Sequence, residues 1–425
     1  MDAPAPKGLP MLGLLMTVAL GLADTSPPPQ TIYEGGEVWT GSGFTRGAVV
    51  VEGDRIVAPG QARPDAHRVS VAGRYLTPAY GNAHAHVTPA TPEASRRYTD
   101  AGVFYVWNPN TVVLGPDAKA FWARPDAYDV RVSQGGITEP GGHPERLYVE
   151  ILAGPVYGGR PREWFVGNAF HYGATPAEID AALDLLVSQG ADFVKAYLLD
   201  SEHYAELRDD PDAYGRKGLN PENMPYLVAA AHARGLFVVV HVETAHDIAV
   251  AARAGADVAG HLPGYAATTE AELAGARLTP EIATLVAAAG MQVIPTYALI
   301  RGDAYDAETA LSADLANVAA VQRENLRLLR VAGVKVLMGT DGFGPVWTEA
   351  EHLVEIGAMT SAEAATMVLS TGARLFPERR IGCLDPGCEA DFLILDADPT
   401  QDIRALRRIA GRVMQGAALP GPEDR

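Results

Sequence analysis

The stretch that decides the fold is Leu76-Thr77-Pro78-Ala79-Tyr80-Gly81-Asn82-Ala83-His84-Ala85-His86, an apolar run that ends in two histidines one residue apart. In a β-strand, residues two apart project to the same side. The two imidazoles would then form half of a metal site at the end of a strand. A bound dication matters because it can turn water into a nucleophile near neutral pH. Alone, the triplet is equally compatible with two polar residues in a loop.

Similar apolar runs recur along the middle of the chain and alternate with helix-like segments. Besides Tyr75–Ala83, the runs are Gly102–Trp107, Tyr128–Ser133, Phe193–Leu198, Leu236–His241, Asp257–His261, Met291–Pro295 and Lys335–Thr340. The helix-like segments include Thr175–Gln189, Pro221–Arg234, Ala245–Ala254, Pro280–Ala289 and Ala313–Val331. Eight strands that alternate with helices predict an α/β protein with a (β/α)8 TIM barrel. The Gly/Pro-rich region 135–173 has the length of a loop that shapes a substrate pocket.

The two ends of the chain have a different, β-like pattern. Short alternating segments occur at Thr31–Trp39 and Gly47–Val57, and again at Cys388–Asp396 and Ile409–Met414. Within the first pair, Glu52-Gly53-Asp54 has the composition of a hairpin turn. We therefore expect a small β-sandwich domain formed by both chain ends, residues 30–78 and 378–420, around a barrel domain of residues 79–377.

The composition is that of a soluble globular protein with a large core. The chain has 425 residues, of which 48% are hydrophobic and 20% charged, and its formal net charge is −18. The charges are dispersed and form no basic cluster, which argues against nucleic acid and anionic membrane surfaces as partners. A small-molecule substrate is the partner we expect, and formation of a homo-oligomer stays open.

The first residues resemble a secretory signal peptide. Lys7 precedes an apolar segment from Leu9 to Ala23, which is too short for a comfortable membrane span, and Gly21-Leu22-Ala23 offers small residues for cleavage. We therefore expect residues 1–23 to be a signal peptide and the protein to be periplasmic or secreted, without membrane association after its removal. The alternative is a misassigned start codon before a cytoplasmic protein.

Two cysteines, Cys383 and Cys388, flank the turn-like sequence Leu384-Asp385-Pro386-Gly387. In an oxidising compartment a disulfide across this turn is open to them, and two free, partly buried thiols are the alternative. Two cysteines are too few for a cysteine-rich zinc site.

Six side chains with metal-binding chemistry stand at or near strand ends, where barrel enzymes keep their active sites. They are His84 and His86 after the first run, Lys195 in the fourth, His241 and His261 after the fifth and sixth, and Asp341 after the eighth. A single strand-end histidine is more often a polar cap than a ligand. Six such residues in one barrel would be an improbable coincidence, so we expect them at one mouth.

These motifs resemble those of the amidohydrolase superfamily over nearly the whole chain. His84-Ala85-His86 is similar to its first-strand H-x-H motif, Gly255-Ala256-Asp257 with His261 to its sixth-strand motif, and Gly339-Thr340-Asp341 to its eighth-strand motif. Val51–Val57 resembles its N-terminal hairpin, and 381–391 its return into the β-domain. Lys195 resembles the carboxylated lysine of the binuclear subtype, in the branch of prolidases and imidazolonepropionases.

The resemblance implies a ligand set and cofactors. His84, His86 and Asp341 would bind one divalent metal ion, and His241 and His261 the second. Lys195 would bridge the two ions as a CO2-derived carbamate, because an unmodified ammonium would be repelled by a dication. Imidazole and carboxylate ligands suit zinc, while manganese, iron and cobalt remain alternatives. An unmodified Lys195 in an enzyme with one metal ion is the other interpretation.

The resemblance also implies a reaction. A metal-activated hydroxide would hydrolyse a carbon–nitrogen bond, an amide such as an Xaa-Pro or N-acyl amino acid link, with Asp341 as general acid/base. His143, in Gly141-Gly142-His143-Pro144, resembles a substrate-contacting histidine, although the inserted segment 137–140 departs from the pattern. Tyr197 lies on the same side of its strand as Lys195 and either donates to substrate or packs.

Other functions stay open at this stage. They are hydrolysis of a cyclic amide of the imidazolonepropionate type, a lactonase or phosphotriesterase activity, and a non-catalytic metal-binding protein. A non-catalytic protein would be expected to have lost some of the metal-binding residues, and all six positions still carry a residue type that can bind metal.

Overall fold

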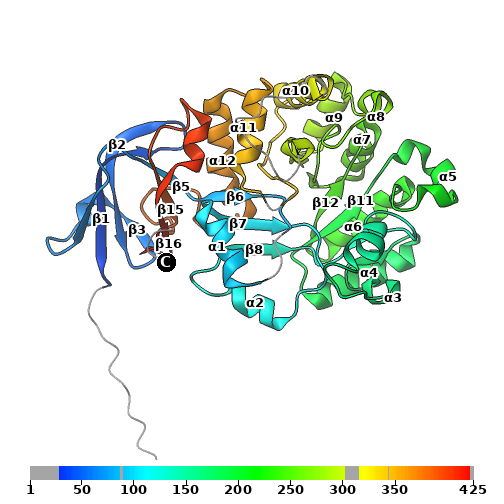
Figure 1. Cartoon of the computed structure of the whole chain (residues 1–425), viewed down its shortest axis with the longest axis horizontal. Coiled ribbons are helices and arrows are strands. Elements are labelled where there is room, and N and C mark those ends of the chain that lie inside the picture. Colours follow the sequence, from blue (N-terminus) through cyan, green and yellow to red (C-terminus); the bar gives the residue numbers. More distant parts are fainter. Residues whose placement is uncertain (1–27, 87–89, 302–314, 343, 422–425) are drawn as a thin grey trace, which may run out of the picture.

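The computed structural model describes residues 28–86, 90–301, 315–342 and 344–421, and shows an α/β protein with a β-rich part built from both chain ends (Figure 1). The predicted signal peptide, residues 1–23, lies outside the described residues. Within the described part, every helix is too short or too polar to cross a bilayer.

The β-rich part is one eight-stranded sheet. Its strands, in spatial order, are β17 (Ala417–Ala418), β16 (Ile409–Met414), β15 (Phe392–Leu395), β5 (Tyr75–Pro78), β1 (Gln30–Trp39), β2 (Phe44–Glu52) and β3 (Arg55–Val57), with β4 (His67–Ser70) also pairing with β1. The strand β5 pairs antiparallel with β15, so an early and a late segment of the chain lie side by side. The prediction that both ends build this part is confirmed. The expected sandwich of two sheets is corrected to one hydrogen-bonded sheet.

The hairpin predicted at Glu52-Gly53-Asp54 is confirmed. Strands β2 and β3 pair antiparallel with Glu52 opposite Arg55, so Gly53 and Asp54 form the two-residue turn. Gly53 has a φ of +61°, which a glycine adopts without steric cost.

Two parallel sheets form the middle of the molecule. One contains β6 (Tyr80–Asn82), β7 (Val103–Asn108) and β8 (Asp129–Val132). The other has the order β10 (Phe170–Tyr172), β9 (Gly136–Thr138), β11 (Phe193–Tyr197), β12 (Phe237–His241), β13 (Val258–Ala259) and β14 (Gln292–Val293). Every residue of β7 and β11 is buried, as expected for parallel strands covered on both faces.

The eighth run connects these two sheets without forming a strand of its own. Val336 forms a single parallel bridge with Val293, and Gly342 forms one with Ala85. The amide of Ala83 donates to the carbonyl of Met338 at 2.8 Å. The described strands thus make two linked, open sheets, where one closed eight-stranded ring was expected.

Helices follow most of the parallel strands and cover the sheets (Figure 1). The longer ones are α1 (Pro92–Asp100), α2 (Pro116–Trp122), α4 (Pro176–Gln189), α6 (Met224–Ala233), α7 (Ala245–Ala254), α9 (Pro280–Ala288), α10 (Ala316–Val331), α11 (Trp347–Glu355) and α12 (Ser361–Leu375). The predicted start of α4 is confirmed, because Thr175 caps the helix and exchanges hydrogen bonds with Glu178 in a capping box.

Two local expectations change. The run Tyr75–Ala83 is divided at Ala79, with β5 in the β-rich sheet and β6 in a parallel sheet. The region 135–173 contains β9, β10, a π-helix at Leu147–Leu152 and the short helix α3 (Arg162–Phe165). A small core of its own, around Tyr148, Phe165 and Phe170, stabilises this region, which explains why it is more ordered than a plain loop.

Candidate functional site

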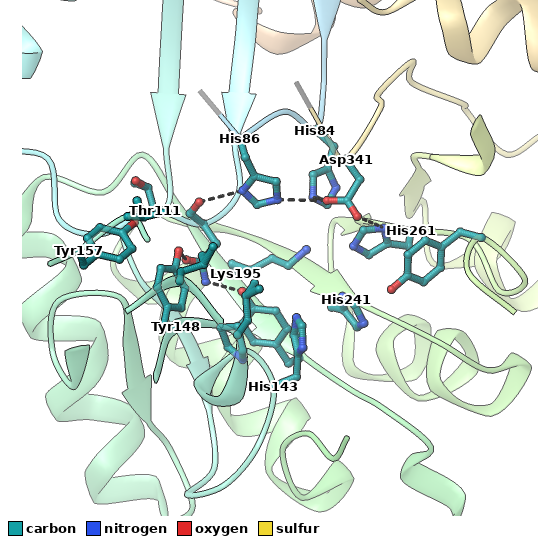
Figure 2. Close-up of a pocket in the computed structure, with 18 residues that line it drawn as sticks. His84, His86, Thr111, His143, Tyr148, Tyr157, Lys195, His241, His261 and Asp341 are labelled. Carbon is teal, nitrogen blue, oxygen red and sulfur yellow. Dashed lines mark hydrogen bonds and ion pairs between the residues drawn. The ribbon is translucent and has the colours of Figure 1, made fainter. Parts of the chain in front are cut away.

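One pocket brings together all eight site residues predicted from the sequence. Figure 2 shows it at the carboxyl ends of the parallel strands. Its cavity volume is about 380 Å³. Its lining includes the six predicted metal ligands and the two predicted substrate contacts, namely His84, His86, Lys195, His241, His261, Asp341, His143 and Tyr197.

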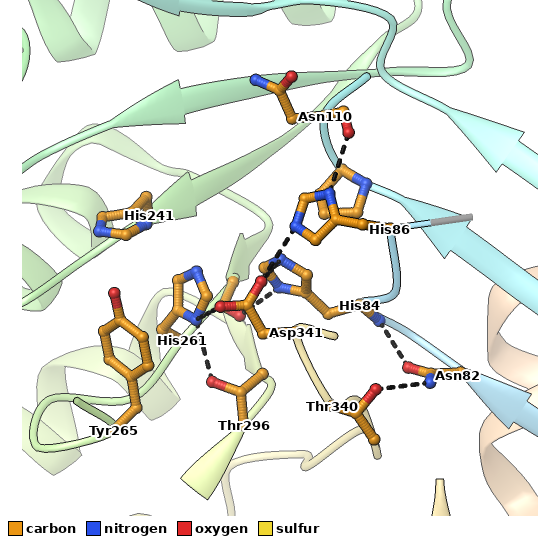
Figure 3. Close-up of polar contacts among 12 residues, drawn as sticks. Asn82, His84, His86, Asn110, His241, His261, Tyr265, Thr296, Thr340 and Asp341 are labelled. Carbon is orange, nitrogen blue, oxygen red and sulfur yellow. Dashed lines mark hydrogen bonds and ion pairs between the residues drawn. The ribbon is translucent and has the colours of Figure 1, made fainter. Parts of the chain in front are cut away.

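Asp341 lies at the centre of the first group of ligands. Its Oδ1 atom is 2.9 Å from Nε2 of His84 and 3.1 Å from Nε2 of His86 (Figure 3). The ligand atoms of these three residues all lie within 4.8 Å of one another, which is close enough for one metal ion. Asp341 has a left-handed backbone with φ +53°, a strained conformation of the kind that often occurs at functional sites.

His84 and His86, which follow β6, each have the other ring nitrogen held by a backbone carbonyl. His84 Nδ1 is 2.7 Å from the oxygen of Gly260, and His86 Nδ1 is 3.0 Å from the oxygen of Asn110. A carbonyl only accepts, so Nδ1 must carry the proton in both rings. That tautomer leaves Nε2 as the free lone pair, which is how proteins usually orient a metal-binding histidine.

His261 and His241 are held in the same way by side chains. His261 Nδ1 is 2.9 Å from Oγ1 of Thr296, and His241 Nε2 is 2.9 Å from Oε1 of Glu243. The ring centroids of His84 and His261 are 4.5 Å apart, and those of His241 and His261 are 4.6 Å apart. The four imidazoles therefore form one continuous cluster.

The Lys195 side chain extends into this cluster between the His84–His86 pair and His241 (Figure 2). It is only 2% exposed, and its Nζ atom has no hydrogen-bond partner among the described residues. A buried, unpaired ammonium is costly. The geometry thus leaves this atom to be satisfied by a group beyond the chain's own described side chains.

Burial sets the charge state of the site. It lowers the pKa of His84 to about 4 and that of His241 to about 3, so both rings are neutral near pH 7. Burial likewise lowers the pKa of Lys195 to about 8, against the opposing charge of Asp341. Burial opposes ionisation of Asp341, but His261 and His84 outweigh it and hold the pKa of this carboxyl well below its usual value.

His143 and Tyr197 stand on the side of the pocket nearer to His241. The His143 ring stacks on His241 with centroids 5.0 Å apart, and it lies 5.2 Å from the Tyr197 ring. The hydroxyl of Tyr197 accepts a hydrogen bond from the Asn110 amide. Both residues face the space in front of the imidazole cluster, where a substrate would lie.

Sequence reasoning missed the residues that hold the histidines, and it predicted one wall of the pocket only as the region 135–173, without naming its residues apart from His143. Thr296 and Asn110 follow predicted strands but belong to no motif that we used. Glu243 stands two residues after His241, and this H-x-E spacing at a strand end was an available signal. Tyr265 was also missed; its ring stacks on His261 at 4.2 Å, and its hydroxyl donates to Glu243 at 3.0 Å.

Comparisons with known proteins agree with this picture. A family model described as "Amidohydrolase family" matches residues 210–416. No curated protein sequence matches the chain.

Solved structures share the fold over almost the whole chain. One is a prolidase complexed with N-methylphosphonate-L-proline, with a TM-score of 0.68 and 20% identity, covering 92% of this chain and 99% of that one. A Xaa-Pro dipeptidase with bound methionine has a TM-score of 0.67 and 18% identity, covering 92% and 100%. The ochratoxinase of A. niger has a TM-score of 0.68 and 20% identity, covering 93% and 97%.

At such identities a structural likeness shows the fold, and the family match adds the sequence evidence. The family match covers residues 210–416, just under half of the chain, and these residues include His241, His261 and Asp341. This part of the chain is thus similar to the amidohydrolase family, and the fold of the whole chain agrees with that similarity.

Proposed function

We propose that the protein hydrolyses an amide carbon–nitrogen bond of a small molecule with the help of two divalent metal ions, which we expect to be zinc. The observation behind this proposal is a cluster of four imidazoles, each with one ring nitrogen held by a neighbour, while the other nitrogen faces Asp341 or is left without a hydrogen bond. Such an arrangement fits metal ligands better than histidines that merely fill a core.

The donor set divides naturally into two halves. His84, His86 and Asp341 would hold one ion, His241 and His261 the other, and Lys195 would bridge them as a carbamate. The unpartnered, buried Nζ of Lys195 fits this assignment, because a carbamate would turn a costly ammonium into an anionic ligand. Because Nε2 of His241 contacts Glu243, Nδ1 is the nitrogen left for a metal ion.

A bound dication would lower the pKa of a water molecule and polarise the scissile carbonyl. Asp341, central in the pocket, is placed to accept a proton from the attacking water and pass it to the leaving nitrogen. His143 and Tyr197 are placed to contact the substrate, because both face the cavity beside the ligands.

The proposal extends to the architecture and the location of the protein. We propose that the two parallel sheets form one (β/α)8 barrel closed through the eighth run, since that run bonds to both β14 and the end of β6. Residues 79–377 would be the barrel domain, and 30–78 with 378–420 the β-domain. We also keep export through residues 1–23 as a proposal, which a mature N-terminus at Met1 would refute.

The test is a hydrolysis screen with the metal content controlled. The full chain is stripped with a chelator, reloaded with zinc, manganese or cobalt, and assayed on linear amides, a cyclic amide, a lactone and a phosphotriester. We expect metal-dependent cleavage of a linear amide. Cleavage without metal, or of the lactone or phosphotriester alone, would contradict the proposal.

A matched pair of variants connects this activity to the site. Asp341→Asn is expected to lower kcat by about 10²–10⁴-fold, the usual range for loss of a general acid–base. Asp209→Asn, at a side chain that is 82% exposed, is the control and should leave kcat unchanged.

A further inference from the structure

One side of the pocket is an apolar wall formed by a single segment of the chain. The wall consists of Leu147, Tyr148, Leu152, Val156 and Tyr157, which all line the cavity. Figure 2 shows Tyr148 and Tyr157 on the side of the pocket across from His261. The wall therefore faces the candidate metal ligands across the space for the substrate.

The wall has its own support behind it. Tyr148 packs against Phe165 with ring centroids 5.8 Å apart, and Tyr157 packs against Phe165 at 5.4 Å. The hydroxyl of Tyr148 donates to Oδ1 of Asn110 at 2.7 Å, so its polar atom is already satisfied. What the wall offers to a ligand is mainly apolar and aromatic surface in a fixed position.

The pocket lacks a cationic clamp for a carboxylate. Among the residues that line it, Lys195 is the sole lysine or arginine, and we assign it to the metal ligands. The sequence places no lysine or arginine in the internal segments 87–89, 302–314 or at position 343. A substrate carboxylate against the inner, buried part of the wall at Tyr148 would leave water without a cationic partner, which is unfavourable.

The cationic side chains near the wall in the sequence are engaged elsewhere. Arg146 pairs with Glu150 at 2.9 Å, Arg162 pairs with the buried Glu145 at 2.6 Å, and the exposed Arg160 lies over the Trp164 ring at 5.2 Å. None of the three lines the cavity. Binding a carboxylate with one of them would require it to leave its present partner.

We propose that the substrate is an amide with an uncharged aliphatic or aromatic group against the apolar wall and no free carboxylate. The inference rests on the proposed amide hydrolysis and narrows it, because it disfavours dipeptides and N-acyl amino acids. The cavity volume of about 380 Å³ suits a molecule of the size of an anilide.

The first test compares substrates that differ only in charge. Hexanoylanilide is compared with two analogues that each carry one carboxylate. In 4-(hexanoylamino)benzoate it is on the anilide ring, and in the monoanilide of adipic acid it is at the end of the acyl chain. With the metal-loaded full chain we expect kcat/KM for hexanoylanilide to exceed that of both analogues by at least about tenfold. Equal or better cleavage of a carboxylated analogue, a dipeptide or an N-acyl amino acid overturns the inference while amide hydrolysis stands. If no amide is cleaved, the proposed function fails and the inference with it.

The second test moves charge onto the wall. Val156 and Ile151 are exposed apolar residues of the same segment, at 59% and 56%, and of the two only Val156 lines the cavity. Val156→Lys should shift the ratio of kcat/KM toward the carboxylated analogues by at least about fivefold, whereas Ile151→Lys should leave it unchanged. Equal effects of the two variants would overturn the role of the wall. Thermal unfolding of both variants checks that each is folded.

Discussion

Thr296 shows how one hydroxyl can orient a histidine that we propose as a metal ligand. Its Oγ1 lies 2.9 Å from Nδ1 of His261, and its backbone has φ +52°, which is unusual for a β-branched residue. The chain thus holds this residue in a strained conformation at the point where it reaches the imidazole. Strain of this kind persists only where surrounding contacts enforce it.

Thr296→Val removes the hydroxyl and keeps the side-chain shape. Loss of a partner to a ligating histidine typically weakens metal affinity by about 10–100-fold, and we expect a loss in that range for one of the two ions. A titration of the metal-free protein against a chromogenic chelator measures it. Thr366→Val in α12, where the hydroxyl bonds only to a carbonyl of its own helix, is the control. An unchanged affinity in Thr296→Val would mean that this hydroxyl does not orient His261 for metal binding.

Among the helices, α11 contacts the 3-10 helix Tyr297–Arg301 through polar side chains. Arg301 Nε donates to Nδ1 of His352 at 3.0 Å, and Nε2 of His352 donates to Gln322 at 2.9 Å. A neutral His352 with the proton on Nε2 satisfies both contacts. Burial first, and the charge of Arg301 second, lower the pKa of His352 to about 3.

This shift predicts part of the acid sensitivity of the fold. The pKa of His352 is about 3 in the folded chain against 6.5 as its ordinary value. The stability that it contributes is therefore complete above pH 6.5 and is lost as the pH falls toward 3, by up to about 1.4 kcal/mol per pH unit. In urea unfolding between pH 7 and 4, His352→Gln should show a shallower decline than the unaltered chain. Parallel pH profiles would show that His352 does not contribute.

A second element-level feature is the disulfide that closes the turn leading back into the β-rich sheet. Cys383 and Cys388 are bonded at a sequence separation of 5, which decides between the disulfide and the free thiols in favour of the disulfide. The amide of Ile56 in β3 donates to the carbonyl of Cys388 at 2.9 Å, so the turn also pairs with the N-terminal hairpin.

For so short a loop, the disulfide should add about 2 kcal/mol to stability. We expect a reductant to lower the urea midpoint of the unaltered chain correspondingly. The double variant Cys383→Ala/Cys388→Ala should unfold at that lower midpoint whether or not reductant is present. If reductant leaves the urea midpoint of the unaltered chain unchanged, as it should in the double variant, a stabilising disulfide is ruled out.

Elements with strong local patterns were predictable, and elements that depend on distant contacts were not. The predicted helix Ala245–Ala254 is α7, and the run Leu236–His241 contains β12. By contrast, Lys335–Thr340 has the pattern of a strand but forms only an isolated bridge, at Val336, although its backbone also bonds to Val293 on one side and to Ala83 and His84 on the other. The segment 147–157 lies in the region 135–173 that was predicted to shape a pocket, but its conformation could not be predicted, because it depends on packing against Phe165 and Phe170.

At the scale of the whole molecule, the site also combines features that local sequence patterns predict with features that depend on distant contacts. The convergence of the site residues could be predicted because parallel strands bring their carboxyl ends to one edge, so that His84, His241 and Asp341 line one pocket although they are far apart in sequence. Most of the groups that hold the histidine rings in place could not be predicted, because a backbone carbonyl such as that of Gly260 leaves no pattern in the sequence. The β-rich sheet depends equally on both chain ends, since β5 pairs with β15.

The central claim is that six residues of this pocket hold two metal ions bridged by Lys195. The most direct test is the metal content per chain, measured by mass spectrometry after reloading with zinc in the presence of bicarbonate. We predict two ions in the unaltered protein and in Lys335→Ala, whose lysine is exposed, and at most one in Lys195→Ala. A single ion per chain, retained when Lys195 is replaced, would contradict the claim.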